Sequence, residues 1–186
     1  YEILIRMHEE ENNLMPPGSF LPLVDQFKMM PKLDRWIINH IIQWLSVHPE
    51  TSLVFYLNVS KDTLSDQSFP SFMQDRLHEM KTSASNLCFE IEVSDAETNT
   101  ENTLIFAQKM RELGCLISLC SFCNTPESLN LLDKMKVDYL KIDASLIKNI
   151  ATNENSYKIT KTIIEFAKNL NLKTIAEFVE NEEIFN

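Results

Sequence analysis

The sequence predicts an α/β fold in which parallel strands alternate with helices. Short apolar runs such as Leu53–Val59 are continuous enough for strands that are covered on both faces. Between such runs, apolar residues repeat with helical spacing, for example from Ile37 to Leu45. Alternating strands and helices with right-handed connections build a parallel sheet. An open doubly wound sheet and a barrel both satisfy this order.

The first quarter of the chain holds one predicted strand and two predicted helices. The alternating stretch Tyr1–Arg6 is expected to be a strand, followed by a charged loop at 8–13 and a turn at 15–18. Ser19 can cap a short helix that runs to Phe27. Pro31 suits the first turn of a longer helix, which we expect to end before His48-Pro49-Glu50.

The remaining chain continues the alternation without a linker, so residues 1–186 are expected to form a single domain. Gly114 is a stop signal for the helix that precedes it. Five further strands are predicted at Leu53–Val59, Leu87–Val93, Leu116–Phe122, Tyr139–Ile142 and Lys173–Phe178, which makes six in all. Four helices are predicted between them at Phe69–Met80, Glu101–Leu113, Pro126–Met135 and Ser156–Leu170.

Composition excludes several classes of function. A net charge of −10 argues against surfaces that bind DNA, RNA or anionic membranes, because these need basic patches. No apolar run approaches the roughly 18 residues of a membrane span, so no membrane insertion is expected in this segment. With only Gly18 and Gly114, neither a Walker loop nor a GxGxxG motif can be written.

Three of the four cysteines have a spacing that is superficially similar to that of iron–sulfur ligands. Cys115, Cys120 and Cys123 form C-x4-C-x2-C, and the fourth ligand would have to be Cys88, which lies upstream. The run is embedded in an apolar strand, which favours reduced and mostly buried thiols. A redox or metal role for this cluster stays open.

Polar side chains occur at or near one end of five predicted strands. They are Glu2, Arg6, Asn58, Glu90, Glu92, Lys141, Asp143, Glu177 and Glu180. Each has a structural alternative: Glu2 or Glu92 can face solvent, and Asp143 can cap a helix near Ala144. Together they predict a pocket at the carboxyl end of a barrel. Carboxylate and amide oxygens suit Mg²⁺ or Mn²⁺ and phosphate-ester hydrolysis, with a lysine to orient the attacking water.

Seven segments, which together span essentially the whole chain, form an ordered pattern. They are Glu2–Arg6, Pro17–Phe20, Asp34–Trp36, Asn58–Ser60, Phe89–Ile91, Val137–Asp143 and Ala176–Glu180. In this order they are similar to the EAL family of cyclic-di-GMP phosphodiesterases, with Ile3 in place of the signature alanine. The resemblance implies a TIM-like (β/α) barrel in a cytoplasmic protein of bacterial signalling. It also implies that this chain is incomplete, a fragment that lacks both ends of the domain.

The resemblance assigns expected roles position by position. Metal-ligand positions are Glu2, Asn58, Glu90 and Glu177, and catalytic positions are Lys141 and Glu177. Ligand-binding positions are Glu2, Leu4, Arg6, Asn58, Glu90, Asp143 and Glu180, with Arg6 matching a contact to substrate phosphate.

Departures from the family pattern gather at the predicted pocket. Cys120 and Ser121 stand where the family has two metal-binding aspartates, and neither supplies a hard anionic oxygen. The loop at 124–128 lacks glycine, Val93 replaces an acid that steadies that loop, and the bulky Phe178 replaces a glycine at the pocket mouth. We therefore expect the catalytic and metal positions to be vestigial, with no cofactor, whereas active relatives use Mg or Mn.

Three functions follow from the sequence. The first is a domain that binds cyclic-di-GMP as a receptor without hydrolysing it. The second is a protein-interaction module that no longer binds nucleotide and acts through protein partners, flanking signalling domains or a homodimer. The third, an active phosphodiesterase, conflicts with the residues at 120 and 121.

Overall fold

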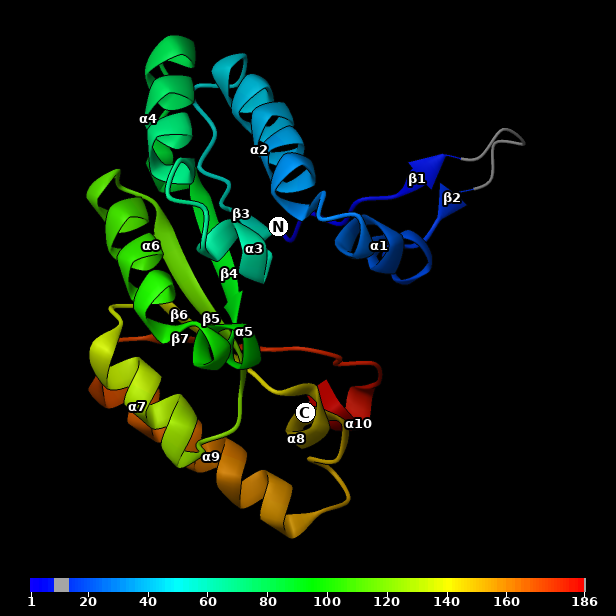
Figure 1. The fold of residues 1–186 in the computed structure, drawn as a ribbon. Helices are drawn as coiled ribbons and strands as arrows, with labels where there is room; N and C mark the ends of the chain where they lie inside the picture. Colours follow the sequence, from blue (N-terminus) through cyan, green and yellow to red (C-terminus); the bar gives the residue numbers. More distant parts are fainter. Residues whose placement is uncertain (9–13, 186) are drawn as a thin grey trace.

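Five parallel strands form the centre of the protein in a computed structural model that describes residues 1–8 and 14–185. In order along the chain they are β3 (Phe55–Asn58), β4 (Leu87–Glu92), β5 (Leu116–Phe122), β6 (Tyr139–Ile142) and β7 (Lys173–Ala176). Each strand pairs with the strand before it, so the spatial order is β3-β4-β5-β6-β7 (Figure 1). A doubly wound sheet would reverse its strand order at a switch point. The sequential order therefore favours barrel-type winding.

The first predicted strand is reduced to a single bridge. Glu2 bridges Tyr56 in parallel, and the Ile3 amide donates to the Tyr56 carbonyl at 2.9 Å. The chain then forms β1 (Met7–His8), which pairs antiparallel with β2 (Leu14–Met15) apart from the main sheet (Figure 1). This hairpin was not expected. Most of the predicted loop, residues 9–13, lies outside the described part of the chain.

The six predicted helices appear in the predicted order, as α1, α2, α4, α6, α7 and α9, among ten helices in the described part of the chain. They are α1 (Pro17–Gln26), α2 (Met30–Ser46), α3 (Lys61–Leu64), α4 (Phe69–Met80), α5 (Val93–Thr98), α6 (Thr100–Glu112), α7 (Pro126–Lys134), α8 (Ala144–Lys148), α9 (Glu154–Asn169) and α10 (Glu182–Phe185), with a 3₁₀ turn at Ala84–Asn86. The cap predicted at Ser19 is wrong, because α1 already begins at Pro17 and has no side-chain cap. Gly114 ends its helix at φ 94°, as predicted.

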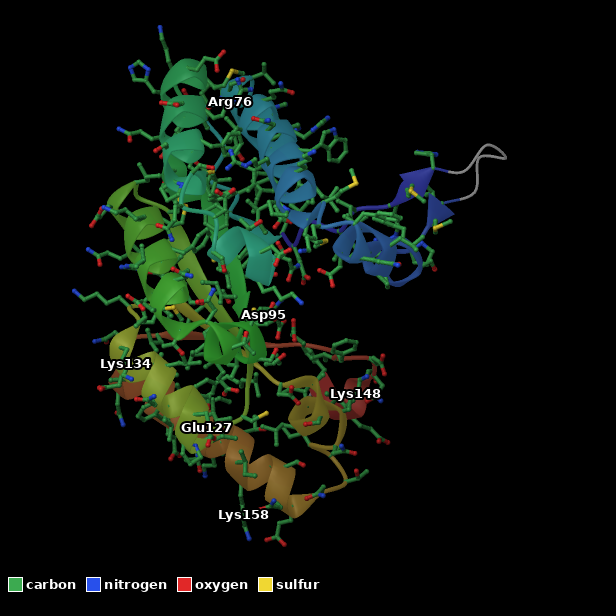
Figure 2. The ribbon with its side chains drawn as sticks, viewed as in Figure 1. Arg76, Asp95, Glu127, Lys134, Lys148 and Lys158 are labelled. Carbon is green, nitrogen blue, oxygen red and sulfur yellow. The ribbon has the colours of Figure 1, made fainter. Side chains whose placement is uncertain are left out.

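Charged side chains of the outer helices α7 and α9 are exposed. Glu127 and Lys134 on α7 and Lys158 on α9 are exposed and project outward (Figure 2). No helix in the described part of the chain is both long and apolar enough to cross a membrane. The helices therefore present one apolar side to the strands and one charged side outward.

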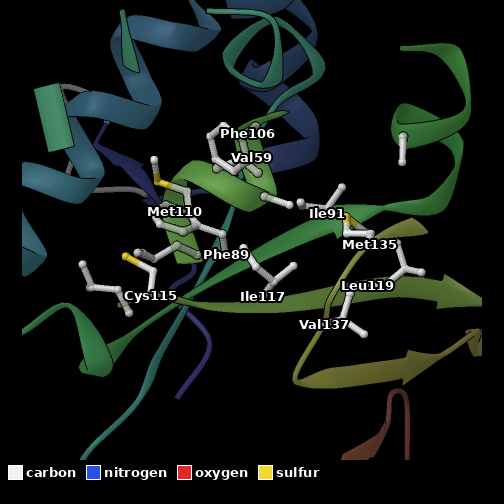
Figure 3. Close-up of a cluster of buried hydrophobic side chains, with 14 of the residues drawn as sticks. Val59, Phe89, Ile91, Phe106, Met110, Cys115, Ile117, Leu119, Met135 and Val137 are labelled. Carbon is white, nitrogen blue, oxygen red and sulfur yellow. The ribbon is translucent and has the colours of Figure 1, made fainter. Parts of the chain in front are cut away.

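The main hydrophobic core lies between the sheet and this helical layer. Phe89 of β4 is fully buried against Phe106 of α6, with ring centroids 5.6 Å apart at 82°. Phe69 of α4 lies 5.5 Å from Phe106 and extends the aromatic cluster. Ile91, Ile117 and Leu119 continue the same apolar face across β4 and β5 (Figure 3). Burying this face fixes the register of the strands.

The opposite face of the sheet carries polar side chains and is concave. Because side chains alternate along a strand, Tyr56, Glu90 and Lys141 share this inner face. Tyr56 of β3 contacts Tyr139 of β6 edge to face, with centroids 5.3 Å apart, although β4 and β5 lie between them in the sheet. Such a contact requires strong curvature, as in a TIM-like barrel. The predicted α/β fold class is confirmed.

Candidate functional site

The Lys141 ammonium lies at the centre of a cluster of three carboxylates. Its Nζ lies 2.6 Å from Glu177 Oε1, 2.8 Å from Glu90 Oε1 and 3.2 Å from Glu2 Oε2. Asn58 Nδ2 donates to the other Glu2 oxygen at 3.3 Å. Five of the residues predicted for the site are therefore brought together.

Strand register and sheet curvature explain why residues so distant in sequence meet. Asn58 pairs with Glu90 across β3 and β4, and Glu2 bridges the neighbouring Tyr56. Lys141 reaches these strands from β6 because the inner face is concave, and Glu177 follows β7 directly. The ordinary alternation of β4 and β6, with apolar residues toward the helices, thus places Glu90 and Lys141 inside.

Burial differs strongly within the cluster. The side chains of Lys141 and Glu90 are 5% and 1% exposed, whereas that of Glu2 is 40% exposed. Burial alone would lower the pKa of Lys141, but its contacts with Glu177 and Glu90 outweigh burial, so the pKa is raised and the amine stays charged. Burial raises the pKa of Glu90, and Lys141 only partly opposes this effect.

One oxygen of this cluster has no partner. Glu90 Oε2 is buried without a hydrogen bond in the described structure. An unsatisfied buried acceptor of this kind costs about 1–3 kcal/mol. One ammonium group thus contacts three carboxylates. The four ionisable groups together carry a formal charge of −2.

The end of β5 carries Cys120 and Ser121 at a bulge. Register between β5 and β6 shifts between Leu119 and Phe122, and Ser121 adopts φ 56°. The bulge lets Phe122 join the apolar core, while Cys120 is buried with its Sγ 3.8 Å from Ser118 Oγ. Burial raises the pKa of the Cys120 thiol, which keeps it neutral. The carboxyl end of β5 thus supplies a thiol and a hydroxyl but no carboxylate.

All four cysteines are free thiols, and three of them are buried. Cys88, Cys115 and Cys120 are buried, and Cys123 is partly exposed; none forms a disulfide. Burial raises the pKa of Cys115 to about 12, and it also raises that of Cys88. Because metal binding and redox reactions use the thiolate, these environments disfavour both roles.

The cluster does not have the geometry of a divalent-cation site. Its oxygens are of the kind that Mg²⁺ prefers, but all three carboxylates already contact the Lys141 ammonium. Among residues 1–8 and 14–185, no group of three or more His, Cys, Asp or Glu side chains is arranged to hold a metal ion. The residues as placed do not fit the metal that the family resemblance implies. That the metal-ligand positions are vestigial stays a prediction.

Four other predicted ligand-binding residues lie apart from this cluster. Arg6 is exposed and its Nη1 donates to the Ile5 carbonyl at 2.8 Å, and Leu4 is 58% exposed. Asp143 caps α8 by accepting from the Ser145 amide at 2.8 Å, which confirms its structural alternative. Glu180 is exposed beyond β7.

A mostly apolar cleft of about 280 Å³ adjoins the cluster, and it is lined by Leu4 and Asn58 of the predicted ligand-binding residues together with residues that were not predicted. It lies between the segment at 3–5, α1, α2 and β3, and it shares Asn58 with the cluster. Asp34 is its buried acid, with Oδ2 accepting from Thr63 Oγ1 at 2.6 Å and from Ser60 Oγ at 2.8 Å. The one available signal was that Asp34 and Ser60 belong to two of the family-like segments.

Phe178 does not line this cleft. It follows Glu177 with φ 55°, and its half-exposed ring lies under Lys148 of α8, with Nζ 4.1 Å from the ring centroid. The aromatic side chain expected at the pocket mouth thus directly follows Glu177 of the carboxylate cluster in the chain, and its printed contact is with Lys148.

Comparison with known proteins agrees with the fold and the residue pattern. A family model described as EAL domain matches residues 1–186. The cyclic di-GMP phosphodiesterase PdeF of Escherichia coli (strain K12) is 34% identical over 186 residues, covering 99% of this chain and 25% of that protein. PdeB of Shewanella oneidensis is 29% identical over 187 residues, covering 100% of the chain and 22% of that protein. The chain spans about a quarter of the length of these relatives.

Solved structures with the same fold have lower identity. The Xanthomonas citri FimX EAL domain in complex with c-diGMP superposes with a TM-score of 0.92 at 20% identity, covering 100% of this chain and 74% of that one. The Pseudomonas aeruginosa FimX EAL domain bound to c-di-GMP gives 0.91 at 23% identity, covering 100% and 75%. At these identities the likeness shows the fold alone, and the family is shown by the model that matches residues 1–186. The chain belongs to the EAL domain family.

Proposed function

We propose that this domain is a receptor that binds cyclic di-GMP and does not hydrolyse it. Named relatives are phosphodiesterases for this nucleotide, and two similar EAL domains were solved with it bound. The observation that carries the proposal is the end of β5, where Cys120 and Ser121 offer no carboxylate to the cluster around Lys141. A domain can still bind the nucleotide after it has lost the side chains that hold the catalytic metal ions.

The expected loss of hydrolysis follows from charge and geometry. Hydrolysis of a phosphodiester by a metal mechanism needs hard oxygen ligands that hold cations against the attacking and leaving oxygens. A buried thiol and a hydroxyl do not replace such ligands. Loss of one well-placed group that stabilises the transition state costs about 10²–10³ in rate. With both positions changed, hydrolysis falls toward the uncatalysed rate.

Binding must overcome the acidic character of the cluster. Three carboxylates and one ammonium leave a formal charge of −2, which repels the ligand phosphates. Arg6 is an exposed cation four residues after Glu2, and the hydrogen bond described for its side chain is to the neighbouring Ile5 carbonyl at 2.8 Å. We therefore assign the main phosphate contact to Arg6.

Calorimetric titration of the full-length protein with cyclic di-GMP tests this proposal. We expect saturable binding that is equal with and without Mg²⁺, and no linear dinucleotide product by chromatography. Product that disappears in Glu2→Ala would contradict the loss of hydrolysis. A flat titration at high micromolar ligand would contradict binding and favour a protein-interaction module instead.

Matched variants locate the contribution of single residues. Arg6→Ala should weaken binding by about 10- to 100-fold, since a charge-assisted hydrogen bond contributes about 1.5–3 kcal/mol. Lys158→Ala is the control, because Lys158 is exposed and pairs with Glu154 on the same helix, α9. The double variant Cys120→Asp with Ser121→Asp tests the end of β5: restored hydrolysis would place the loss there.

A further inference from the structure

The backbone at Phe178 is held in a conformation that a bulky residue rarely adopts. Its φ of 55° lies in the left-handed region. Phe178 is the second residue after β7, which ends at Ala176 and is followed by Glu177. An aromatic residue is strained there, and such residues gather at ligand sites and switch regions. The left-handed turn redirects the chain and sets the direction of the ring.

The ring is fixed by a cation but is not covered. Lys148 Nζ lies 4.1 Å from the ring centroid, whereas 51% of Phe178 remains exposed. Lys148 lies at the end of α8, beside the chain segment that follows β7 (Figure 2). A cation over the ring opposes its rotation, so the ring keeps an open aromatic surface.

Lys148 also brings a positive charge to the ring that follows Glu177 in the chain. Glu177, the neighbour of Phe178, contacts Lys141 Nζ at 2.6 Å. Lys148 forms no ion pair within the part of the chain that the structure describes. A half-exposed ring with an ammonium on it therefore directly follows, in the chain, one of the carboxylates that contact Lys141.

We propose that Phe178 is a stacking platform for a purine base of the bound nucleotide, with Lys148 as the counter-charge for an adjacent phosphate. This inference rests on the proposed function and names the specificity-determining residue of that site. A purine presents a flat π-surface that can stack on an exposed ring. A phosphodiester carries a negative charge that can pair with the Lys148 ammonium. Phe178 thereby fixes the ligand at the carboxyl end of β7.

Phe178→Gly separates binding from folding. Glycine relieves the left-handed strain, so the midpoint of thermal unfolding should stay unchanged or rise. Affinity for cyclic di-GMP, measured by titration of the full-length protein, should fall about 5- to 150-fold through loss of base stacking. Phe185→Ala is the control, since Phe185 is 79% exposed on α10 and should leave affinity unchanged.

Two further variants give readouts that a purely structural role would not change. Phe178→Trp should keep affinity within about threefold, and the ligand should quench the added tryptophan fluorescence relative to wild type, as stacking requires. Lys148→Met should weaken binding and reduce its salt dependence.

The outcomes distinguish this inference from the proposed function. If wild type binds cyclic di-GMP and Phe178→Gly binds it equally well, the stacking role is overturned and the receptor function stands. An unquenched Phe178→Trp with wild-type affinity also overturns the stacking role. Absence of binding by wild type overturns both.

Discussion

The two faces of the sheet are built on opposite principles. Toward the helices, residues such as Phe89 and Ile117 are fully buried among other apolar side chains. On the inner face of the same sheet, Glu90 of β4 and Lys141 of β6 are almost as deeply buried but carry charge. The first face gains stability from the removal of apolar surface from water, whereas the second has to offset the cost of buried charge.

The difference shows which face is available to evolve a new function. An apolar core tolerates only residues of similar volume and polarity, because packing at crystal-like density leaves little space. The inner face instead depends on a balance of charges around Lys141, to which the buried Cys120 of β5 adds no charge. Chemistry at the inner face can thus change while the core keeps the fold.

Phe89→Ala should have the largest effect on stability, because it opens a cavity on the apolar face. Phe89 is fully buried and lies within 6.1 Å of Phe69 and 5.6 Å of Phe106, measured between ring centroids. The free energy of unfolding should fall by about 3–5 kcal/mol, as measured by urea denaturation. Phe27→Ala is the control: Phe27 is 70% exposed and should change stability by less than about 0.5 kcal/mol.

Lys141→Met should come next, because it removes the one ammonium that serves three carboxylates. Breaking a buried ion pair by deleting one partner costs about 3 kcal/mol, since the remaining charge is left without a partner. Lys109→Met is the matched control, as Lys109 is half-exposed and its pair with Glu112 contributes about 0–1 kcal/mol. Equal losses in the two variants, measured by urea denaturation, would show that the inner charges are well solvated.

Sequence patterns predicted the apolar face well because its signals are local. The strands at 116–122 and 139–142 and the helix at 69–80 have the predicted bounds, since each follows from apolar periodicity and clear stop signals. The first strand failed as a continuous element because alternation at 1–6 does not reveal where pairing ends. Short helices such as α3 and α5 are too brief to show helical periodicity.

The site was predicted in its residues but not in its contacts. Strand ends and family resemblance pointed to Glu2, Glu90, Lys141 and Glu177, and these four meet. That Lys141 contacts all three carboxylates depends on the curvature of the sheet, for which the sequence has no local signal. The ring of Phe178 was expected at the pocket mouth, but its left-handed backbone and its contact with Lys148 are tertiary features.

An ion pair outside the sheet completes the comparison and gives the smallest expected effect. Asp66 accepts from Arg35 Nη2 at 2.7 Å and from the Ser68 amide at 2.9 Å. Burial alone would raise the pKa of Asp66, but hydrogen bonds from Ser68 and Arg35 outweigh burial and hold the pKa below its ordinary value of 3.8. The folded state therefore binds this proton less tightly than the unfolded state does. The resulting stability is present above about pH 4 and is lost as pH falls through the folded pKa.

Asp66→Asn should accordingly lower the free energy of unfolding by about 1 kcal/mol at pH 7. The difference from wild type should shrink as pH falls below about 4, because wild-type Asp66 then also becomes neutral. Urea denaturation at several pH values between 7 and 2.5 measures this convergence, with the exposed Asp133→Asn as control. A gap between wild type and Asp66→Asn that stays constant down to pH 2.5 would show that the lost contribution is hydrogen bonding rather than charge. The outer ion pair would then stabilise the helical layer by geometry, unlike the charge-balanced cluster around Lys141.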